Sequence, residues 1–164
     1  MLIRPAIESD AEGIATLRRE TIIAVNARDY PPDVIDNWAN RVDAERIRKT
    51  AAEVKRWVAV TRERMDELLL GFCDHTLDDN ELSRLYTHKD YQGEGVGSRL
   101  LEVAEASMLE QGREEVYLYS TITARDFYLR HGYVVVEETV DAHNPKITVI
   151  KMAKKLSNPV SSAQ

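Results

Sequence analysis

The sequence has few residues that could cross-link the chain, bind a metal or hold it in a membrane. Its single cysteine, Cys73, excludes an intramolecular disulfide. The four histidines, at positions 75, 88, 131 and 143, have no metal-ligand spacing with Cys73 or with one another, so we expect no bound metal. No apolar run approaches the roughly 20 residues of a membrane-spanning helix, and the N-terminus lacks the charged-then-apolar order of a signal peptide. These absences predict a cytoplasmic protein with no membrane partner.

Concentrated positive charge is also lacking. The formal net charge is −6 and the pI is about 5.3, which argues against a nucleic-acid partner, because phosphate backbones are bound through clustered Lys and Arg. A length of 164 residues with 43% hydrophobic content suits one domain. We therefore predict a single domain over residues 1–156 and a flexible C-terminal tail over 157–164.

A short strand at residues 2–3 and an amphipathic helix open the chain. Ser9 and Glu12 have the spacing of a capping box, which predicts the start of this helix. Two weaker helical segments follow, over residues 33–40 and 43–53. The basic residues of this region are expected to form a solvated face: Arg46, Arg48, Lys49, Lys55 and Arg56.

The remainder of the chain alternates strand and helix patterns. Strands are expected at 57–61, 68–76, 82–87, 114–120, 133–140 and 146–154, and helices from the glycine-rich segment to about 111 and over 123–131. The first three of these strands form a meander. The fold class is therefore α/β, with a mixed, mostly antiparallel twisted sheet of six to seven strands flanked by about four helices.

The stretch "YQGEGVG" places Gly93, Gly95 and Gly97 where a strand ends and a helix begins. Free N–H groups and the positive end of the dipole make a helix N-terminus attractive to phosphate, and glycine removes the Cβ atoms that would hold a phosphate off. A simple flexible turn is the alternative, but it would need one glycine and not three. The segment predicts a phosphate-binding loop.

The spacing excludes two well-known phosphate loops. A Walker A loop needs Lys followed by Ser or Thr after its second glycine, whereas Ser98 and Arg99 lie here. A dinucleotide fingerprint needs its third glycine one position later than Gly97, at the start of a βαβ unit.

Two motifs resemble those of the GCN5-related N-acetyltransferases. Gln92, Gly95 and Gly97 match the family signature Gln/Arg-x-x-Gly-x-Gly/Ala position for position. About 30 residues later, "ARDFYLRHGY" at 124–133 is similar to the family segment Ala-x-x-Phe-Tyr-x-x-x-Gly-Phe/Tyr. The resemblance extends over nearly the whole chain.

This resemblance implies that acetyl-coenzyme A is the cofactor, without a metal, and that it wedges between the fourth and fifth strands. Thr121 occupies a position where the family often has a cofactor-contacting asparagine. A dimer through the last strands is common among such proteins. The implied cofactor-binding residues are Leu85, Tyr86 and Thr87 along the pantetheine arm, Gln92, Gly93, Glu94, Gly95, Val96, Gly97 and Ser98 at the pyrophosphate, and Thr121.

The reaction then needs a base and an acid. An ammonium acceptor must lose a proton before it attacks a thioester, and the departing thiolate gains from a proton donor. By the resemblance Tyr128 is that donor; the alternative is an aromatic core residue. Glu81 is the candidate base. The alternatives are that Glu81 is only a charged residue of a hairpin, or that Ser83 or a water chain acts as the base. His75 is expected to face solvent.

The resemblance implies that the acceptor is contacted mainly by roughly residues 22–40 and 137–147. These contain an acidic and aromatic set that would suit a cationic amine: Tyr30, Trp38, Glu137, Glu138, Asp141 and His143. Cys73 lies mid-strand with no obvious base, so we expect direct transfer in a ternary complex and not an acyl-cysteine. The hypothesis is an acetyl-coenzyme A-dependent N-acetyltransferase acting on a primary amine of a small molecule or peptide. The alternative is a catalytically idle member of the same fold that binds acyl-coenzyme A as a sensor or interaction module.

Overall fold

The computed structural model describes residues 1–63 and 66–157. The strands are β1 (Leu2–Pro5), β2 (Val54–Glu63), β3 (Asp66–Thr76), β4 (Leu82–Thr87), β5 (Glu115–Thr121), β6 (Val134–Val140) and β7 (Thr148–Lys155). The helices are α1 (Ala11–Ala24), α2 (Pro32–Asn40), α3 (Ala44–Thr50), α4 (Val96–Glu110) and α5 (Arg125–Arg130). The predicted tail, beyond its first residue, lies outside the described residues.

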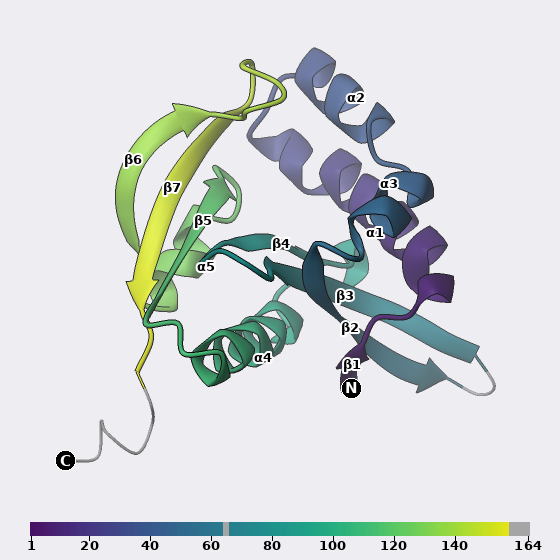
Figure 1. The fold of residues 1–164 in the computed structure, drawn as a ribbon. Coiled ribbons are helices and arrows are strands. Elements are labelled where there is room, and N and C mark those ends of the chain that lie inside the picture. The colour runs from purple at the N-terminus through teal and green to yellow at the C-terminus, as the bar shows by residue number, and fades with distance from the viewer. Residues whose placement is uncertain (64–65, 158–164) are drawn as a thin grey trace.

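The strands form two antiparallel sheets (Figure 1), ordered β1-β2-β3-β4 and β5-β7-β6. The sheets touch where Glu81, just before β4, makes a parallel bridge with Tyr117 of β5. Seven strands and, within the described ranges, five α-helices confirm the predicted α/β fold, with one helix more than the approximate number expected.

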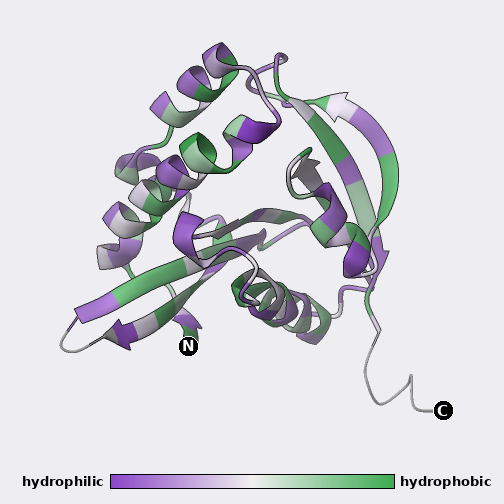
Figure 2. Ribbon diagram, turned by 180° about the vertical axis from the view of Figure 1, so that it is seen from behind, coloured by the Kyte–Doolittle hydropathy of each residue, from purple (hydrophilic) through white to green (hydrophobic). Residues whose placement is uncertain are grey.

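Helices cover both faces of the four-stranded sheet, as Figure 1 shows. Helices α1 and α2 pack with Val58, Val60 and Phe72 in one core cluster. Helix α4 packs on the opposite face with Ala59 and Cys73 in a second cluster. Hydrophobic residues recur along α1 and α4 at helical spacing (Figure 2), which is why each helix can bury one stripe and expose the rest.

The start of α1 differs from the prediction. No capping box forms between Ser9 and Glu12. The carboxylate of Asp10 instead accepts the N–H of Ile7 at 2.8 Å and the guanidinium of Arg4 at 2.8 Å. The aspartate is therefore held by a strand residue that local spacing cannot reveal.

Two further predictions about polar residues were wrong. Arg56 is buried and donates from Nε to Asp74 at 2.8 Å and from Nη1 to the Ile47 carbonyl at 3.1 Å. His75 is fully buried, with Nε2 3.0 Å from the Ser107 hydroxyl. Both side chains satisfy their polar atoms in the interior and do not face solvent.

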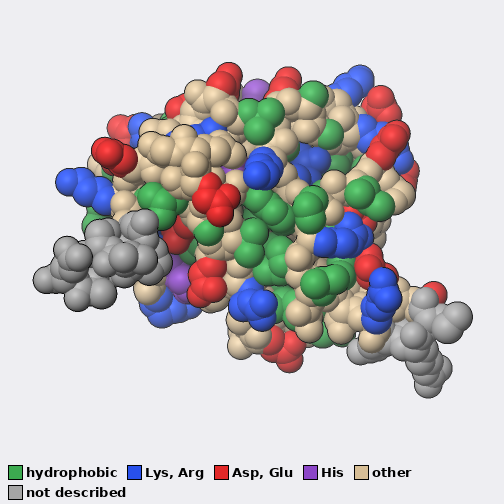
Figure 3. Space-filling view, turned by 60° about the horizontal axis from the view of Figure 1, so that its bottom comes forward, with side chains coloured by type: hydrophobic (Ala, Val, Ile, Leu, Met, Phe, Trp, Pro, Cys, Tyr) green, Lys and Arg blue, Asp and Glu red, His purple; other side chains and the backbone are tan. Residues whose placement is uncertain are grey.

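The surface of the described chain carries both signs of charge. Figure 3 shows one face, on which acidic and basic side chains are interspersed around a central group of hydrophobic ones. Within residues 1–63 and 66–157, no helix combines the length and apolarity that a membrane span requires. In the same ranges, no three His, Cys, Asp or Glu side chains are grouped so as to hold a metal ion.

Candidate active site

A large cleft separates the two sheets where β4 and β5 diverge. Apart from the bridge at Glu81, β4 pairs only with β3, and β5 pairs only with β7. The facing edges of β4 and β5 therefore keep unpaired backbone groups that a ligand can bind. The cavity has a volume of about 1640 Å³, above the roughly 300–1,000 Å³ of common single-ligand pockets, so it has room for two ligands.

A β-bulge in β4 lies in the wall of this cavity. Neighbouring residues Asp74 and His75 of β3 pair with Arg84 and Leu82, so Ser83 between them has no partner. A bulge bends its strand and locally increases the twist, which contributes to the divergence from β5.

The glycine loop forms one end of the cavity. Gly93 and Gly95 have φ values of 75° and 85°, which L-residues rarely adopt. A Cβ built on either glycine would meet nothing within 4 Å, so the space beside the loop is open. Gly95 is the N-cap of α4, and the N–H groups of Val96, Gly97 and Ser98 follow it in the first turn, where a helix has no internal acceptors.

The residues around the loop hold it in place. Gln92 donates to the Thr87 carbonyl at 2.7 Å, which ties the loop to the end of β4. Gly97 lies against Phe127, since a Cβ there would be 3.4 Å from the ring. The Ser98 hydroxyl is 2.9 Å from Nε2 of His131. The exposed side chain of Glu94 does not line the cavity, so only its backbone can serve the loop.

The predicted cofactor residues of the strands all line the cavity. Leu85, Tyr86 and Thr87 form the β4 side, and Thr121 lies across from them at the end of β5. The Thr121 hydroxyl accepts the N–H of Ala124 at 3.1 Å. It therefore helps to start α5 in addition to facing the cavity.

Tyr128 lies on α5 and lines the cavity, although only 5% of the residue is exposed. Burial raises the pKa of its phenol, so the hydroxyl keeps its proton at neutral pH. Its ring packs against Phe127 and Tyr133, at centroid distances of 5.1 and 5.4 Å. The residue combines a core position with a protonated hydroxyl at the cavity.

Glu81 lines the same cavity at the closed end of the cleft. Its pKa is raised, first by burial and then by the nearby carboxylate of Asp79, while Arg84 lowers it. A carboxylate with a raised pKa binds a proton more readily, which makes it a better base. The structure thus brings Glu81 and Tyr128 to one cavity.

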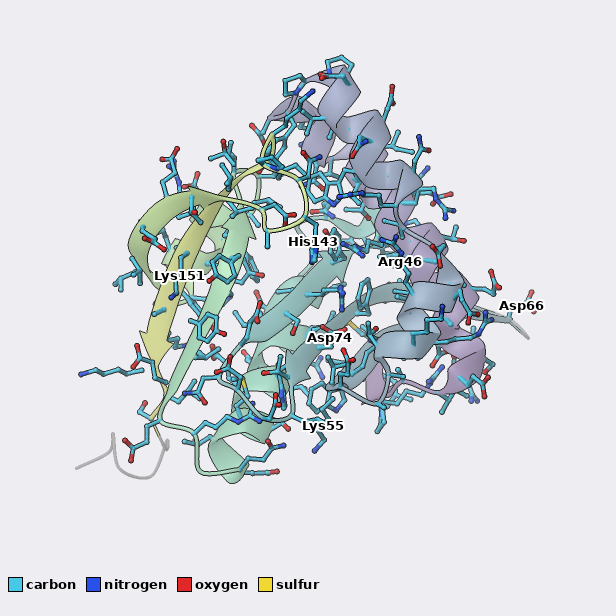
Figure 4. All side chains as sticks on the ribbon, turned by 45° about the horizontal axis from the view of Figure 1, so that its top comes forward. Arg46, Lys55, Asp66, Asp74, His143 and Lys151 are labelled. Atoms are coloured by element: carbon cyan, nitrogen blue, oxygen red, sulfur yellow. The ribbon has the colours of Figure 1, made fainter. Side chains whose placement is uncertain are left out.

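The predicted acceptor-side residues divide into two groups. Trp38, Glu137, Asp141 and His143 line the cavity, whereas Tyr30 and Glu138 do not. Tyr30 is buried, and its hydroxyl donates to the Thr148 carbonyl at 2.7 Å. His143 lies on the β6–β7 loop (Figure 4), and its carbonyl accepts Nη1 of Arg41 at 3.0 Å, which fastens this loop to the α2 end.

Sequence reasoning missed three polar cavity residues from α1 and its end: Arg18, Thr21 and Asn26. Thr21 donates to the Thr87 carbonyl at 3.0 Å, and Asn26 donates to the Thr123 hydroxyl at 3.3 Å. Thr21 and Asn26 are also buried. The sequence signal that could have identified them is the occurrence of polar residues within the apolar stripe of the first helix.

Cys73 is fully buried, and burial raises the pKa of its thiol. It is absent from the cavity lining, and its sulfur is 3.5 Å from the Leu100 carbonyl. A thiol held away from the cavity and in its protonated form is a poor acyl carrier.

A sequence profile of the family described as "Acetyltransferase (GNAT) domain" matches residues 26–156. No curated protein sequence matches the chain. Solved structures do match it over nearly its full length.

A GCN5-related N-acetyltransferase structure from Rhodopseudomonas palustris is 23% identical, with a TM-score of 0.86 over 94% of this chain and 95% of that one. The PaiA N-acetyltransferase of Thermoplasma acidophilum, solved in complex with coenzyme A, is 25% identical, with a TM-score of 0.75 over 94% and 98% of the two chains. An aminoglycoside 6′-N-acetyltransferase complexed with coenzyme A is 17% identical, with a TM-score of 0.68 over 96% and 98%.

Proposed function

This chain belongs to the GNAT acetyltransferase family, and from that premise we propose that it transfers the acetyl group of acetyl-coenzyme A to a primary amine of a small molecule or peptide. The observation that carries the proposal is the cleft between the free edges of β4 and β5. One end of this cleft has the open glycine loop, and its walls carry Glu81 and Tyr128.

The loop residues fit a pyrophosphate group. Gly93 and Gly95 leave open space where side chains would project, and the first turn of α4 offers unpaired N–H groups there. The free edge of β4 at Leu85–Thr87 can hydrogen-bond an extended amide-bearing arm. Two related structures contain coenzyme A, which supports the assignment of this cofactor.

The chain's own residues supply proton transfer. Acetyl-coenzyme A, when bound, supplies the acetyl group as a thioester. Glu81 takes a proton from the ammonium of the acceptor, directly or through water, and its raised pKa suits that role. Tyr128 donates a proton from its hydroxyl to the departing thiolate. The remote, protonated thiol of Cys73 supports direct transfer in a ternary complex.

Calorimetric titration with acetyl-coenzyme A tests the cofactor site. Gly95 and Gly112 lie at the two ends of α4 with φ values of 85° and 80°, and a Cβ on either meets nothing within 4 Å. Alanine at either position should therefore cause similar backbone strain, about 1–2 kcal/mol. Gly95→Ala should lose affinity for acetyl-coenzyme A, whereas Gly112→Ala should keep it, since Gly112 lies outside the cavity.

Absence of binding to the folded wild type would exclude both the enzyme and the idle sensor. Binding without free thiol release, for any amine in a broad screen, would favour the sensor. Gly97 is a poor test position, because a side chain there would also contact the ring of Phe127.

A further inference from the structure

Arg18 is a cation without a protein counter-ion in the part of the chain that the structure describes. It lines the cavity from α1, and its guanidinium carbon lies 5.3 Å from the centroid of the Tyr86 ring. Its Nε atom is buried and has no hydrogen-bond partner among those residues. The ion pairs of the described ranges, counted to 4.0 Å, include none of Arg18.

This environment favours an anionic ligand. A guanidinium cannot lose its proton at physiological pH, so burial of its Nε leaves an unmet hydrogen-bond donor and a partly desolvated charge. The face of Tyr86 compensates only part of that loss. A carboxylate brought by a ligand would satisfy both the charge and the donor geometry.

The neighbouring charges do not neutralise Arg18. Arg84 lies on the same face of β4 as Tyr86, two residues away, and also lines the cavity. Asp74 is shared between Arg56 at 2.8 Å and Arg84 at 3.5 Å. One carboxylate thus serves two guanidinium groups, and the floor of the cavity retains positive charge.

The carboxylates that line the cavity do not pair with Arg18. Glu53, Asp78, Asp126 and Glu137 are exposed at its rim, where solvent and salt weaken their fields. Asp141 accepts the N–H groups of His143 and Asn144 in its own loop.

Half-buried Glu81 is therefore the carboxylate whose charge counts most inside the cavity. The interior offers a base at Glu81, an unpaired cation at Arg18 and a second cation at Arg84, which shares the carboxylate of Asp74 with Arg56.

We propose that Arg18, assisted by Arg84, binds a carboxylate of the acceptor, so that the preferred acceptors are amino acids or other amines that carry a carboxylate. This inference rests on the proposed amine acetylation. The same chemistry would also bind a phosphate of coenzyme A, and the experiment below separates these two sources.

The experiment measures free thiol release with matched acceptors: β-alanine, 4-aminobutyrate and lysine, each against its carboxamide. We expect the carboxylate member of each pair to have a kcat/KM at least about tenfold higher than its carboxamide. This factor corresponds to about 1.4 kcal/mol for the one charge-assisted contact that the carboxamide lacks. In Arg18→Met the KM for the carboxylate member should rise and the preference should vanish. The KM for the carboxamides and the affinity for coenzyme A should be unchanged.

The adjacent Arg19 provides the control. It lies outside the cavity and donates to the Val42 carbonyl, so Arg19→Met should keep the preference for carboxylates. Arg18→Met should also fold at least as stably as wild type in the absence of ligand, because it removes an unpaired buried donor.

Equal rates for carboxylates and carboxamides would overturn the carboxylate subsite and leave the proposed function standing. Weaker coenzyme A binding by Arg18→Met would overturn it in favour of a cofactor phosphate contact. Absence of thiol release with every amine would exclude the proposed function. In that case thermal unfolding tests whether Arg18 still binds a carboxylate. Millimolar 4-aminobutyrate should raise the unfolding temperature of wild type but not of Arg18→Met. Equal effects on both proteins would overturn the carboxylate subsite.

Discussion

Glu81 forms a parallel bridge with Tyr117, and within the described residues this bridge joins the two sheets. The N–H of Tyr117 donates to the Asn80 carbonyl at 3.0 Å and closes the same end of the cleft. Beyond it, β4 and β5 diverge toward the glycine loop. The candidate base therefore lies at the closed end of the cleft, and the N-terminus of α4, the proposed pyrophosphate site, lies at the open end.

Replacement of Glu81 by glutamine should lower kcat at neutral pH by about 100- to 10,000-fold, the usual contribution of a general base. Only the deprotonated carboxylate can accept a proton, so wild-type activity should fall as pH decreases through the raised pKa of Glu81. Glu81→Gln should lose this acidic limb. Thiol release measured across pH with an amine found by screening checks both expectations.

Asp79 offers a control for the cause of that pKa shift. Its carboxylate helps to raise the pKa of Glu81 but does not line the cavity. Asp79→Asn should move the acidic limb to lower pH while activity above it is retained. A Glu81→Gln variant with the wild-type rate and profile would refute the base assignment.

Replacement of Tyr128 by phenylalanine should keep the packing of α5 and remove the proton donor. We expect kcat to fall by about 100- to 10,000-fold, while calorimetry shows unchanged coenzyme A affinity. Tyr133 is a matched control, since it is equally buried and its hydroxyl donates to Glu105 at 2.8 Å. Tyr133→Phe should cost about 1.5–3 kcal/mol of stability without a comparable loss of kcat. Equal kcat losses in both variants would point to a packing role for Tyr128.

The fold was predictable because its signals are local. The apolar spacing of α1 and α4 and the glycines at both ends of α4 depend on residues within a few turns of one another. The two motifs likewise identified the cavity residues of the glycine loop and Tyr128.

The contacts that decide burial of polar groups were not predictable. His75 meets Ser107 from 32 positions away, and Arg56 meets Asp74 across two paired strands. No local pattern distinguishes Arg18 from other charged residues of the chain, since its place beside Tyr86 depends on how α1 crosses the sheet. Such pairings require the tertiary arrangement, which periodicity does not specify.

The pair formed by Arg56 and Asp74 should dominate the stability of the sheet-to-α3 contact. Asp74 is fully buried, and its Oδ1 has no hydrogen-bond partner among the described residues. Arg56→Met would leave that charge with Arg84 alone, and we expect a loss of about 3–5 kcal/mol in urea unfolding.

Arg46 is the control for this prediction, because it was expected to share the same solvated face. Its side chain is 68% exposed and pairs with Asp43 at 3.7 Å. Figure 4 shows Arg46 among the helices and Asp74 on the sheet. Arg46→Met should change stability by less than about 1 kcal/mol. Similar losses for both variants would mean that the buried pair adds nothing beyond a surface one.

Buried His75 should make stability depend on pH. Its Nδ1 donates to the Thr76 carbonyl at 2.7 Å, so neutral Nε2 accepts the Ser107 hydroxyl at 3.0 Å. Burial lowers the pKa of the imidazole, and the guanidinium of Arg113, 3.3 Å from Nδ1, lowers it further. Below about pH 6.5 the imidazole therefore binds a proton in the unfolded chain but stays neutral in the folded chain until the pH reaches its lowered pKa.

Stability due to His75 should be fully present above pH 6.5 and decline as pH falls from there toward the lowered pKa of the folded state. The slope is at most about 1.4 kcal/mol per pH unit for one group. Urea unfolding at pH 7.5, 6.5 and 5.5 measures it as the difference between wild type and His75→Gln, so that contributions from carboxylates cancel. The exposed His143, changed to Gln, should leave the wild-type pH dependence intact. A difference between wild type and His75→Gln that does not change with pH would show that the buried imidazole is as easily protonated as a free one.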